Sequence, residues 1–247
     1  MEVLGIDIGG SGIKGAIVDT KTGKLVTKRH RIETPQPAKP EAIAETIKQI
    51  VGHFDYKGKI GCGFPAVMQN GLIKTATNIH KSCIDVDANK LFSKVTGCKV
   101  KVFNDADVAG YAELKSDSCR IGKYKDFKGM TLFLTIGSGI GSALFYQDTL
   151  IPNTELGHVF MENGLKCEQY ASDAIRKKKD LTWLKWGKRF NEVLEYLEFL
   201  FNPELIILGG GASKKFDKFS KELKTKAVVE PAKLLNQAGI IGGALLA

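Results

Sequence analysis

Apolar residues along the chain fall into two alternating patterns, short strand-like runs and longer stripes with helical spacing. The first half predicts strands near residues 2–8, 14–19, 24–32, 59–63 and 100–103, with helices near 40–53, 87–95 and 105–115. The second half predicts strands near 130–136, 141–147 and 205–208, with helices near 168–178, 182–201, after Ser213 and over 232–247. Strands interleaved with helices in this way indicate a layered α/β fold.

Two glycine-rich stretches repeat one plan roughly half a chain apart. "DIGGSGIKGAIV" begins at Asp7 and "TIGSGIGSALF" at Thr135, and each is typical of a strand, a glycine turn and a second strand. Glycines let backbone amides approach an anion closely, and successive amides can form an anion-binding concavity. The repeat therefore suggests two related lobes with a phosphate between them, and two chance glycine-rich hairpins are the alternative.

The glycine spacing also resembles two nucleotide motifs that the flanking sequence does not support. Gly10, Gly12 and Gly15 spell G-x-G-x-x-G, but a second strand follows where a dinucleotide turn needs a helix, and no Gly-Lys-Ser/Thr follows. A third cluster at residues 209–211 can present amides to phosphate or form a tight turn. The candidate donor-phosphate residues are Asp7, Gly9, Gly10, Ser11, Gly12, Lys14, Thr135, Gly137, Ser138, Gly139, Gly209, Gly210 and Gly211.

Polar side chains at strand ends supply candidate acceptor chemistry. Asp105 follows the strand near 100–103, where a carboxylate can take the proton of a sugar hydroxyl, or can cap the helix that begins there. Asn104 can hold neighbouring hydroxyls with its amide. Further candidates for binding a sugar are Glu155, His158, Glu168, and, in a loop-rich stretch, Gly63, Pro65 and Asn78. His158 is also compatible with a core or surface histidine, whereas no nearby cysteine pair supports a zinc site.

Composition and charge narrow the class of protein. The chain has 247 residues, 43% hydrophobic and 26% charged, which is typical of a globular protein. Its net charge of +9 attracts polyanions, but no nucleic-acid-binding signature is found, so we expect no nucleic-acid partner. The five cysteines are scattered without C-x-x-C spacing, which argues against a disulfide framework. Without a membrane-length apolar run or a signal-peptide pattern, we expect no membrane partner and a cytoplasmic location.

These motifs, taken in order, resemble the sugar kinases of the ROK family, within the hexokinase–actin–Hsp70 superfold. The D-x-G-G-S at residue 7 and "LTIGSGIGSALF" are similar to that family's two phosphate motifs. "GFPAV", "TATN", "FNDADVAGYAE", "LIPNTELGH" and "DLTWLKWGKRF" with "LFNPELIILGGGASKK" follow the polyphosphate glucokinase branch in order, over nearly the whole chain. The resemblance implies a duplicated, two-lobed actin-like ATPase or ribonuclease H-like fold, with mixed sheets and a cleft between the lobes.

The resemblance also implies roles for these residues. Asp105 would take the proton from the glucose 6-hydroxyl, Asn104, Glu155, His158 and Glu168 would hold the sugar, and Asp7 would hold Mg²⁺ indirectly. The chain departs from the wider family after His158, where a cysteine-rich zinc motif is usual and only Cys167 is present, so no zinc is expected. It also has Cys83 where the polyphosphate branch commonly has an aromatic residue, with an unknown effect on the pocket.

The identity of the phosphate donor depends on a run of basic residues. A linear phosphate chain needs repeated cations along a groove, and such a groove is predicted at Lys177, Lys178, Lys185, Lys188 and Arg189, flanked by Arg176 and Lys179. The alternative is a solvated surface, with Trp183 and Trp186 as core or dimer contacts. Polyphosphate and ATP present the same terminal phosphate, so the catalytic residues do not distinguish them.

Together with this resemblance, the sequence predicts a kinase that uses Mg²⁺ to phosphorylate glucose from polyphosphate, with ATP left open as a second donor, and the resemblance alone implies a homodimer. The alternatives are a strictly ATP-dependent hexose or N-acetylhexosamine kinase, a non-catalytic sugar sensor, and a nucleic-acid-binding protein, which the net charge permits. We predict an N-terminal lobe over residues 1–106, a C-terminal lobe over 107–233, and a terminal helix over about 234–247 that packs back on the first lobe.

Overall fold

The computed structural model describes residues 1–77, 79–116 and 127–247, and it contains two compact units. One unit comprises residues 1–120 and 237–247, and the other comprises residues 121–236. The division therefore falls later than the boundary predicted near residue 107, because the helix that begins at Asp105 packs within the first unit. Asn78, a predicted sugar residue, lies outside the described residues.

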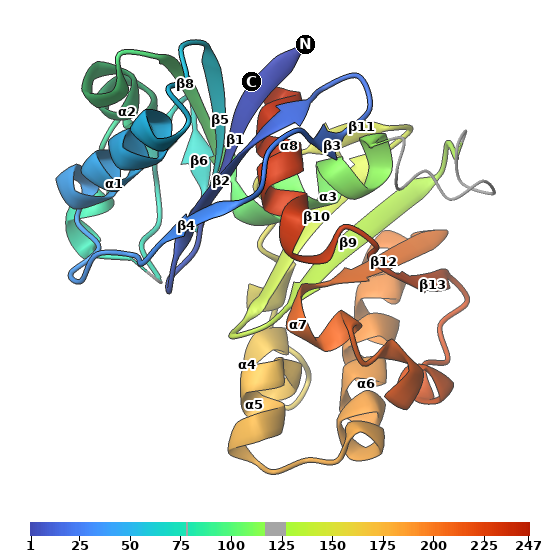
Figure 1. The fold of residues 1–247 in the computed structure, drawn as a ribbon. Coiled ribbons are helices and arrows are strands. Elements are labelled where there is room, and N and C mark those ends of the chain that lie inside the picture. The colour runs from blue at the N-terminus through green and yellow to red at the C-terminus, as the bar shows by residue number, and fades with distance from the viewer. Residues whose placement is uncertain (78, 117–126) are drawn as a thin grey trace. The chain divides into compact units, whose positions relative to one another are not determined.

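The first unit is built on a mixed sheet (Figure 1). Its strands are β1 (Glu2–Ile8), β2 (Ile13–Asp19), β3 (Lys24–Leu25), β4 (His30–Ile32), β5 (Lys59–Phe64) and β8 (Lys99–Asn104), in the order β3-β2-β1-β5-β8 with β4 also paired to β2. The β1–β2 pair is antiparallel, whereas β1, β5 and β8 are parallel. Because the carboxyl ends of parallel strands meet at one edge, Asp7, Gly63 and Asn104 lie at the same edge.

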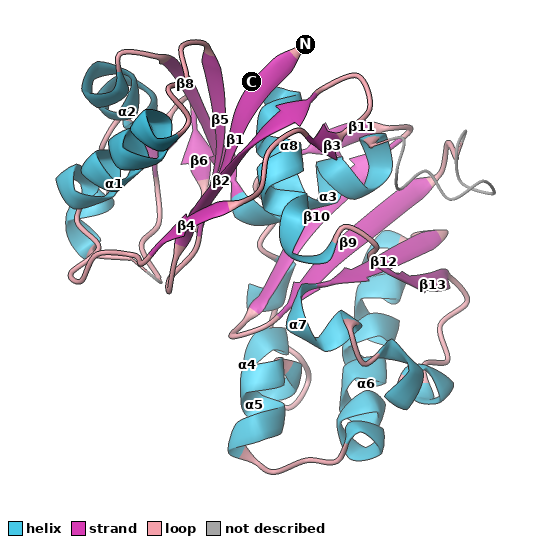
Figure 2. Cartoon of the chain, viewed as in Figure 1, coloured by secondary structure: helices cyan, strands magenta, loops and turns pink. Residues whose placement is uncertain are grey.

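Helices cover this sheet (Figure 2). Helices α1 (Pro40–His53) and α2 (Ala88–Thr96) pack together, and α3 (Asp105–Lys115) packs against α8 (Ala238–Leu246), which lies on β1 and β5. Gly5 and Gly61 allow this contact, because a Cβ atom at either position would meet the backbone carbonyl of Ile240 or Gly243. A small hairpin of β6 (Met68–Gln69) and β7 (Leu72–Ile73) precedes the short turn η1 (Lys81–Cys83).

The second unit repeats the sheet plan. Strands β9 (Met130–Ile136), β10 (Ile140–Tyr146), β11 (Thr149–Ile151), β12 (Leu205–Gly209) and β13 (Val228–Pro231) have the order β11-β10-β9-β12-β13. As in the first unit, an antiparallel hairpin joins two further parallel strands. The helices are α4 (Cys167–Ala171), α5 (Asp173–Lys178), α6 (Trp183–Phe201) and α7 (Gly210–Ser213), with short turns η3 (Leu156–His158), η4 (Phe216–Lys218), η5 (Ser220–Glu222) and η6 (Leu235–Gln237).

The residue pairing within the two hairpins shows which positions of the repeat correspond. Ile8 pairs with Ile13 around a turn of residues 9–12, and Ile136 pairs with Ile140 around the shorter turn of residues 137–139. Asp7 and Thr135 are therefore equivalent positions, because one residue separates each of them from its turn. Asp7 pairs with Gly63 on the neighbouring parallel strand, and Thr135 pairs with Gly209 in the same way. The predicted duplication therefore appears in the topology as well as in the sequence.

Several element boundaries differ from the prediction for local reasons. The strand expected over 24–32 is interrupted, because the Thr27 side chain accepts the Ile17 N–H where a strand would pair. The helix expected over 168–178 breaks at Ser172, whose hydroxyl caps α5 at Ile175 N. The helix expected after Ser213 is wrong: α7 ends there, and the hydroxyl of Ser213 donates to Gly210 O. The terminal helix starts at Ala238 rather than at 232.

The core of the second unit explains both tryptophans. Trp186 is fully buried, stacks on Phe190 with ring centroids 4.9 Å apart, and donates its indole N–H to Ala171 O at 2.9 Å. Trp183 contacts Trp186 edge-on and stacks on Phe219. These contacts give both rings a core role.

Within the described residues, no helix has the length and apolar character needed to cross a membrane.

Candidate active site

Backbone carbonyl oxygens of the first glycine turn accept hydrogen bonds from within the protein. Gly9 N donates to Gly12 O at 3.1 Å, Gly9 O accepts from the Thr34 hydroxyl at 2.5 Å, and Ser11 O accepts from Arg31 Nη2 at 2.7 Å. The amides of Gly10, Ser11 and Gly12 have no hydrogen-bond partner within the described part of the chain. Such a turn presents several N–H groups to an anion.

Asp7 stands at the base of this turn and fits a hydrated cation. Its Oδ2 pairs with Lys14 Nζ at 3.1 Å, while Oδ1 lies beside Gly239, where a Cβ atom would be only 2.9 Å away. Mg²⁺ in phosphate sites is commonly held by one or two carboxylates plus waters and substrate oxygens, so one carboxylate suffices. Among the described residues no group of three metal-ligating side chains is found.

The second glycine turn lies directly against a predicted sugar ligand. Gly137 N donates to Gly139 O at 3.0 Å, and Gly137 O accepts from Ala174 N at the start of α5 at 3.1 Å. Gly139 packs against the carboxylate of Glu168, so that a side chain at position 139 would displace it. Ser138 is exposed at the tip of the turn. In the second unit, a phosphate-type turn and a carboxylate are therefore in contact.

The third glycine cluster closes the end of β12. Gly209 pairs with Thr135 in the sheet, and Gly210 has a φ of +77° and lies against the Ile136 backbone. A side chain at 210 would be strained in this conformation and would meet that backbone. Gly211 has open space around it. The three predicted glycine clusters thus include two, at 137–139 and 209–211, that adjoin the same end of β9.

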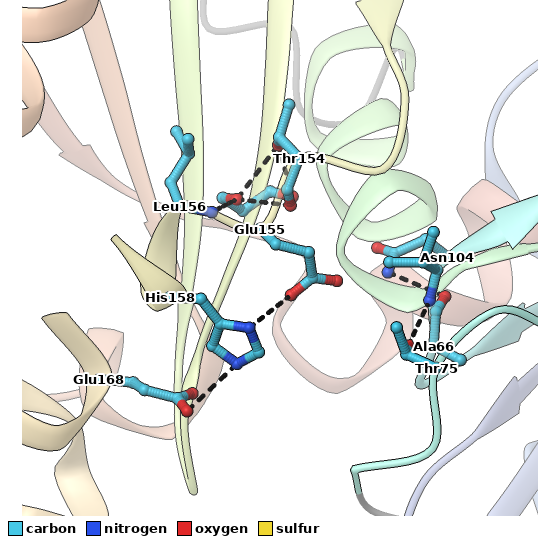
Figure 3. A network of polar contacts seen from close by, with 10 residues as sticks. Ala66, Thr75, Asn104, Thr154, Glu155, Leu156, His158 and Glu168 are labelled. Carbon is cyan, nitrogen blue, oxygen red and sulfur yellow. Dashed lines mark hydrogen bonds and ion pairs between the residues drawn. The ribbon is translucent and has the colours of Figure 1, made fainter. Parts of the chain in front are cut away.

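Asn104 and Asp105 divide their roles differently from the prediction. Asn104 is the residue that caps α3, because its Oδ1 accepts from Ala106 N at 2.9 Å and Asp107 N at 3.0 Å. Its amide nitrogen donates to Ala66 O at 3.1 Å (Figure 3). The alternative in which Asp105 is the cap is therefore wrong. Asp105 is the first helical residue and is half-buried, and its Oδ1 accepts from Ala106 N at 2.8 Å.

The strand next to Asp105 is also shaped by a glycine. A Cβ atom at Gly63 would lie 3.6 Å from Asp105 Cα and 2.7 Å from a Val108 methyl group. Pro65 follows in the same segment, and the Asn104 bond to Ala66 fixes it. The absence of a side chain at Gly63 therefore leaves room for the start of α3 beside Asp105, and the contact of Gly63 and Pro65 with a sugar stays a prediction.

His158 lies between two carboxylates of the second unit (Figure 3). Its Nε2 is 3.2 Å from Glu168 Oε1, and its Nδ1 is 3.9 Å from Glu155 Oε2. Burial raises the pKa of Glu155, the neighbouring His158 opposes this shift, and the charge of Glu168 adds to it. Three predicted sugar residues are thus brought together, and the core-histidine alternative does not describe a half-exposed ring held in this way.

A buried serine that sequence reasoning missed positions Glu155. The Ser142 hydroxyl donates to Thr154 O at 2.7 Å and accepts from Leu156 N at 2.9 Å, while the Thr154 hydroxyl donates to Ser142 O. These bonds flank Glu155 on both sides. The only indication of Ser142 in the sequence is a polar residue inside the apolar strand "IGSALFY". Arg31 and Thr34, which contact the first turn, were also missed, and no pattern in the sequence marks them.

Comparison with known proteins places the chain in a family. The model of the ROK family matches residues 3–174. The chain belongs to the ROK family. A polyphosphate glucokinase of Mycobacterium tuberculosis (strain CDC 1551 / Oshkosh) is 43% identical over 98% of this chain and 89% of its own length, and one of Mycobacterium leprae is 40% identical over 98% of this chain. This ROK protein is therefore similar throughout to phosphotransferases and is itself an enzyme of that class.

Solved structures agree with this ROK fold. An inorganic polyphosphate/ATP-glucomannokinase from Arthrobacter sp. strain KM has a TM-score of 0.91 and 39% identity, covering 99% of this chain and 97% of that one. A ROK family glucokinase from Streptomyces griseus, solved with glucose and AMPPNP, has a TM-score of 0.83 at 21% identity over 100% of this chain and 99% of that one, and so supports the fold alone.

The basic region of this ROK protein contains both engaged and exposed cations. Arg176 and Lys177 pair with Asp173 at 2.7 and 2.8 Å, Arg176 also stacks over Trp183, and Arg189 lies over the Tyr170 ring. In the basic region at residues 176–189, the exposed lysines for which no ion pair with a described residue is found are Lys178, Lys179, Lys185 and Lys188. Two of the five predicted groove residues, Lys177 and Arg189, therefore have internal roles, and Lys178, Lys185 and Lys188 remain candidates.

Cys83 occupies a buried position beside α1. Its thiol donates to Ala38 O at 3.5 Å, and burial, with a smaller contribution from Glu41, raises its pKa to about 11. Cys83 therefore acts as a small packing residue in the core of the first unit.

Proposed function

We propose that this chain transfers the terminal phosphoryl group of inorganic polyphosphate to the 6-hydroxyl of glucose. The observation that carries the proposal is the identity of 43% over nearly the whole chain with polyphosphate glucokinases. The Arthrobacter relative is a polyphosphate/ATP-glucomannokinase, which favours ATP as a second donor and mannose as a second acceptor for this chain.

Asp105 is the proposed general base. The glucose 6-hydroxyl gives its proton to the Asp105 carboxylate as O6 attacks the terminal phosphorus, and the bond from that phosphorus to the bridging oxygen breaks. The shortened polyphosphate chain leaves with the electron pair. Asp105 lies in the first turn of α3, and negative charge is stabilised at a helix N-terminus. The Asn104 cap supports this placement by fixing where the helix begins.

Glu155, His158 and Glu168 are proposed to hold the sugar. Carboxylate oxygens accept hydrogen bonds from paired hydroxyls, and the imidazole can add one more. The mutual contacts of His158 with both carboxylates support this role because they orient all three groups before the sugar binds. Asn78 remains a proposed contributor that lies outside the described residues.

The glycine turns and Asp7 are proposed to place the donor. The free amides of the first turn would stabilise charge on the transferring group without reorganisation. A bound Mg²⁺, held through water by Asp7, would neutralise charge on the donor phosphates. Lys14 keeps the Asp7 carboxylate oriented through its 3.1 Å ion pair.

The test is a product assay with each donor offered separately. Purified protein receives glucose with either polyphosphate or ATP, and glucose 6-phosphate is measured by a coupled dehydrogenase. We expect product with polyphosphate, and a second, weaker activity with ATP. Product from ATP alone would replace this proposal with an ATP-dependent kinase, and tight glucose binding with neither activity would replace it with a sugar sensor.

A further inference from the structure

Arg31 is fixed over the first glycine turn by the strand that carries it. It lies on β4, which pairs with β2 so that Arg31 is opposite Lys14 (Figure 1). Its Nη2 donates to Ser11 O at 2.7 Å. A Cβ atom at Gly12 would be 2.5 Å from Arg31 Nε and 2.8 Å from Cζ, so the guanidinium occupies the space that a side chain at 12 would fill.

The charge of Arg31 is not neutralised. Lys14, its neighbour in the sheet, pairs with Asp7, whereas no carboxylate pairs with Arg31 in the described part of the chain. A guanidinium has five N–H donors, and the Ser11 bond uses one of them. An exposed cation without a carboxylate partner among the described residues is therefore held at the rim of a turn whose free amides are suited to an anion.

Arg31 and Thr34 each hold a backbone carbonyl of the first glycine turn, but Thr34 does so without a charge. The buried Thr34 hydroxyl holds Gly9 O at the other end of the same turn without carrying charge. Support of a backbone carbonyl thus needs only a hydroxyl, while a fixed, unpaired guanidinium is suited to binding phosphate oxygens in a forked geometry.

We propose that Arg31 binds the phosphates that follow the transferred one in the donor, and so sets the affinity for a phosphate chain. This inference rests on the proposed function, because that function supplies the donor. It assigns a donor contact to the first unit, apart from the basic region at α5 and α6. The Ser11 bond pre-orders the side chain, so little of its conformational freedom is lost on binding.

The test compares donor and acceptor kinetics in four variants. Arg31→Met keeps an apolar stem over Gly12 and removes the charge, Arg31→Lys restores a charge, and Thr34→Val removes a turn contact without a charge change. Lys94→Met removes an equal charge from an exposed position on α2. KM for polyphosphate of defined lengths, KM for ATP, KM for glucose and kcat are measured, with thermal unfolding to confirm folding.

We expect Arg31→Met to raise KM for polyphosphate about tenfold, because one charge-assisted hydrogen bond to the donor is lost. KM for glucose should not change. Arg31→Lys should recover only part of that loss, because it restores the charge without the forked geometry, and the effect should weaken in high salt. Thr34→Val should lower thermal stability without this selective rise. The inference is overturned if Arg31→Met and Lys94→Met raise the donor KM equally, or if the Thr34 and Arg31 variants behave alike.

A different result would contradict the proposed function, namely that the unaltered protein makes no glucose 6-phosphate from polyphosphate. In that case the ATP data still decide the inference, because ATP also carries phosphates behind the transferred one. A selective rise in KM for ATP in Arg31→Met supports the donor contact, and an unchanged KM overturns it.

Discussion

The two units share one sheet order but carry different chemistry at matched positions. In the first, the turn is preceded by Asp7, which pairs across the hairpin with Lys14, and in the second by Thr135, which pairs with Gly141. The first turn is bordered by charges, and the second is uncharged but has Glu168 packed against it. The two turns therefore share one backbone plan but have different neighbours, and we propose a donor role for the first and a place beside the acceptor sugar for the second.

This comparison explains why the same residue type has different consequences in the two turns. Gly12 makes room for a cation, Arg31, while Gly139 makes room for an anion, Glu168. A side chain at either position would push aside the neighbouring group rather than the backbone. We therefore expect matched glycine substitutions to affect different substrates, although both stand in turns of the same design.

The largest expected effect belongs to Asp105→Asn, which leaves shape intact and removes the base. We expect kcat with polyphosphate to fall about a thousandfold, within the range for loss of a general base. The binding of glucose, followed by calorimetry, should remain close to that of the unaltered protein. Equal folding of the variant is checked by thermal unfolding. Loss of glucose binding in a folded variant would assign Asp105 to sugar binding instead.

The second prediction sharpens the comparison within one turn. Gly139→Ala should displace the Glu168 carboxylate, weaken its 3.2 Å contact with His158 and raise KM for glucose about tenfold. Gly137→Ala is the matched control, because open space surrounds position 137. Its KM for glucose should not change. If both variants raise KM for glucose alike, the effect comes from turn flexibility and not from Glu168.

The third prediction makes the corresponding change in the first unit. Gly12→Ala should displace the Arg31 guanidinium and raise KM for polyphosphate about fivefold, less than complete loss of the charge. KM for glucose should stay constant, in contrast to Gly139→Ala. Steady-state kinetics with each substrate varied in turn measure both. A rise in KM for glucose alone would remove the proposed division of labour between the turns.

The sequence predicted the parts of the site that lie on regular elements. Asp7 and Thr135 lie near the end of a strand whose apolar pattern is clear, and Asp105 directly follows one, so their place at a strand end could be deduced. The helix cap was assigned one residue late, because Asn104 and Asp105 are both good caps and only the backbone of Asn104 is extended. Local pattern alone does not separate two adjacent capping residues.

Contacts between distant segments could not be predicted. Arg31 reaches Ser11 only because β4 pairs with β2, and no periodicity marks a three-residue strand. Ser142 reaches the segment around Glu155 only because that segment folds back over β10. Such contacts depend on tertiary register, which a single sequence specifies weakly for short strands.

The smallest expected effect concerns the stability of the acceptor side. Burial raises the pKa of Glu155, so the folded protein binds its proton more tightly than the unfolded chain does. The free energy of unfolding therefore decreases as pH rises through the folded-state pKa of this group, because the ionised form is disfavoured only in the fold. Glu155→Gln removes this penalty and should raise the unfolding midpoint slightly at pH 7.5, with no gain at pH values below the ordinary glutamate pKa.

Thermal unfolding at acidic and neutral pH checks this sign, with Glu162→Gln as the control. Glu162 is exposed and lies seven positions along the chain from Glu155, so it changes the net charge equally without the burial. KM for glucose should rise in Glu155→Gln even as the midpoint rises, because the ionised group is kept for binding and not for stability. A lower midpoint at neutral pH would mean that the attraction between Glu155 and His158 outweighs the cost of burying the carboxylate.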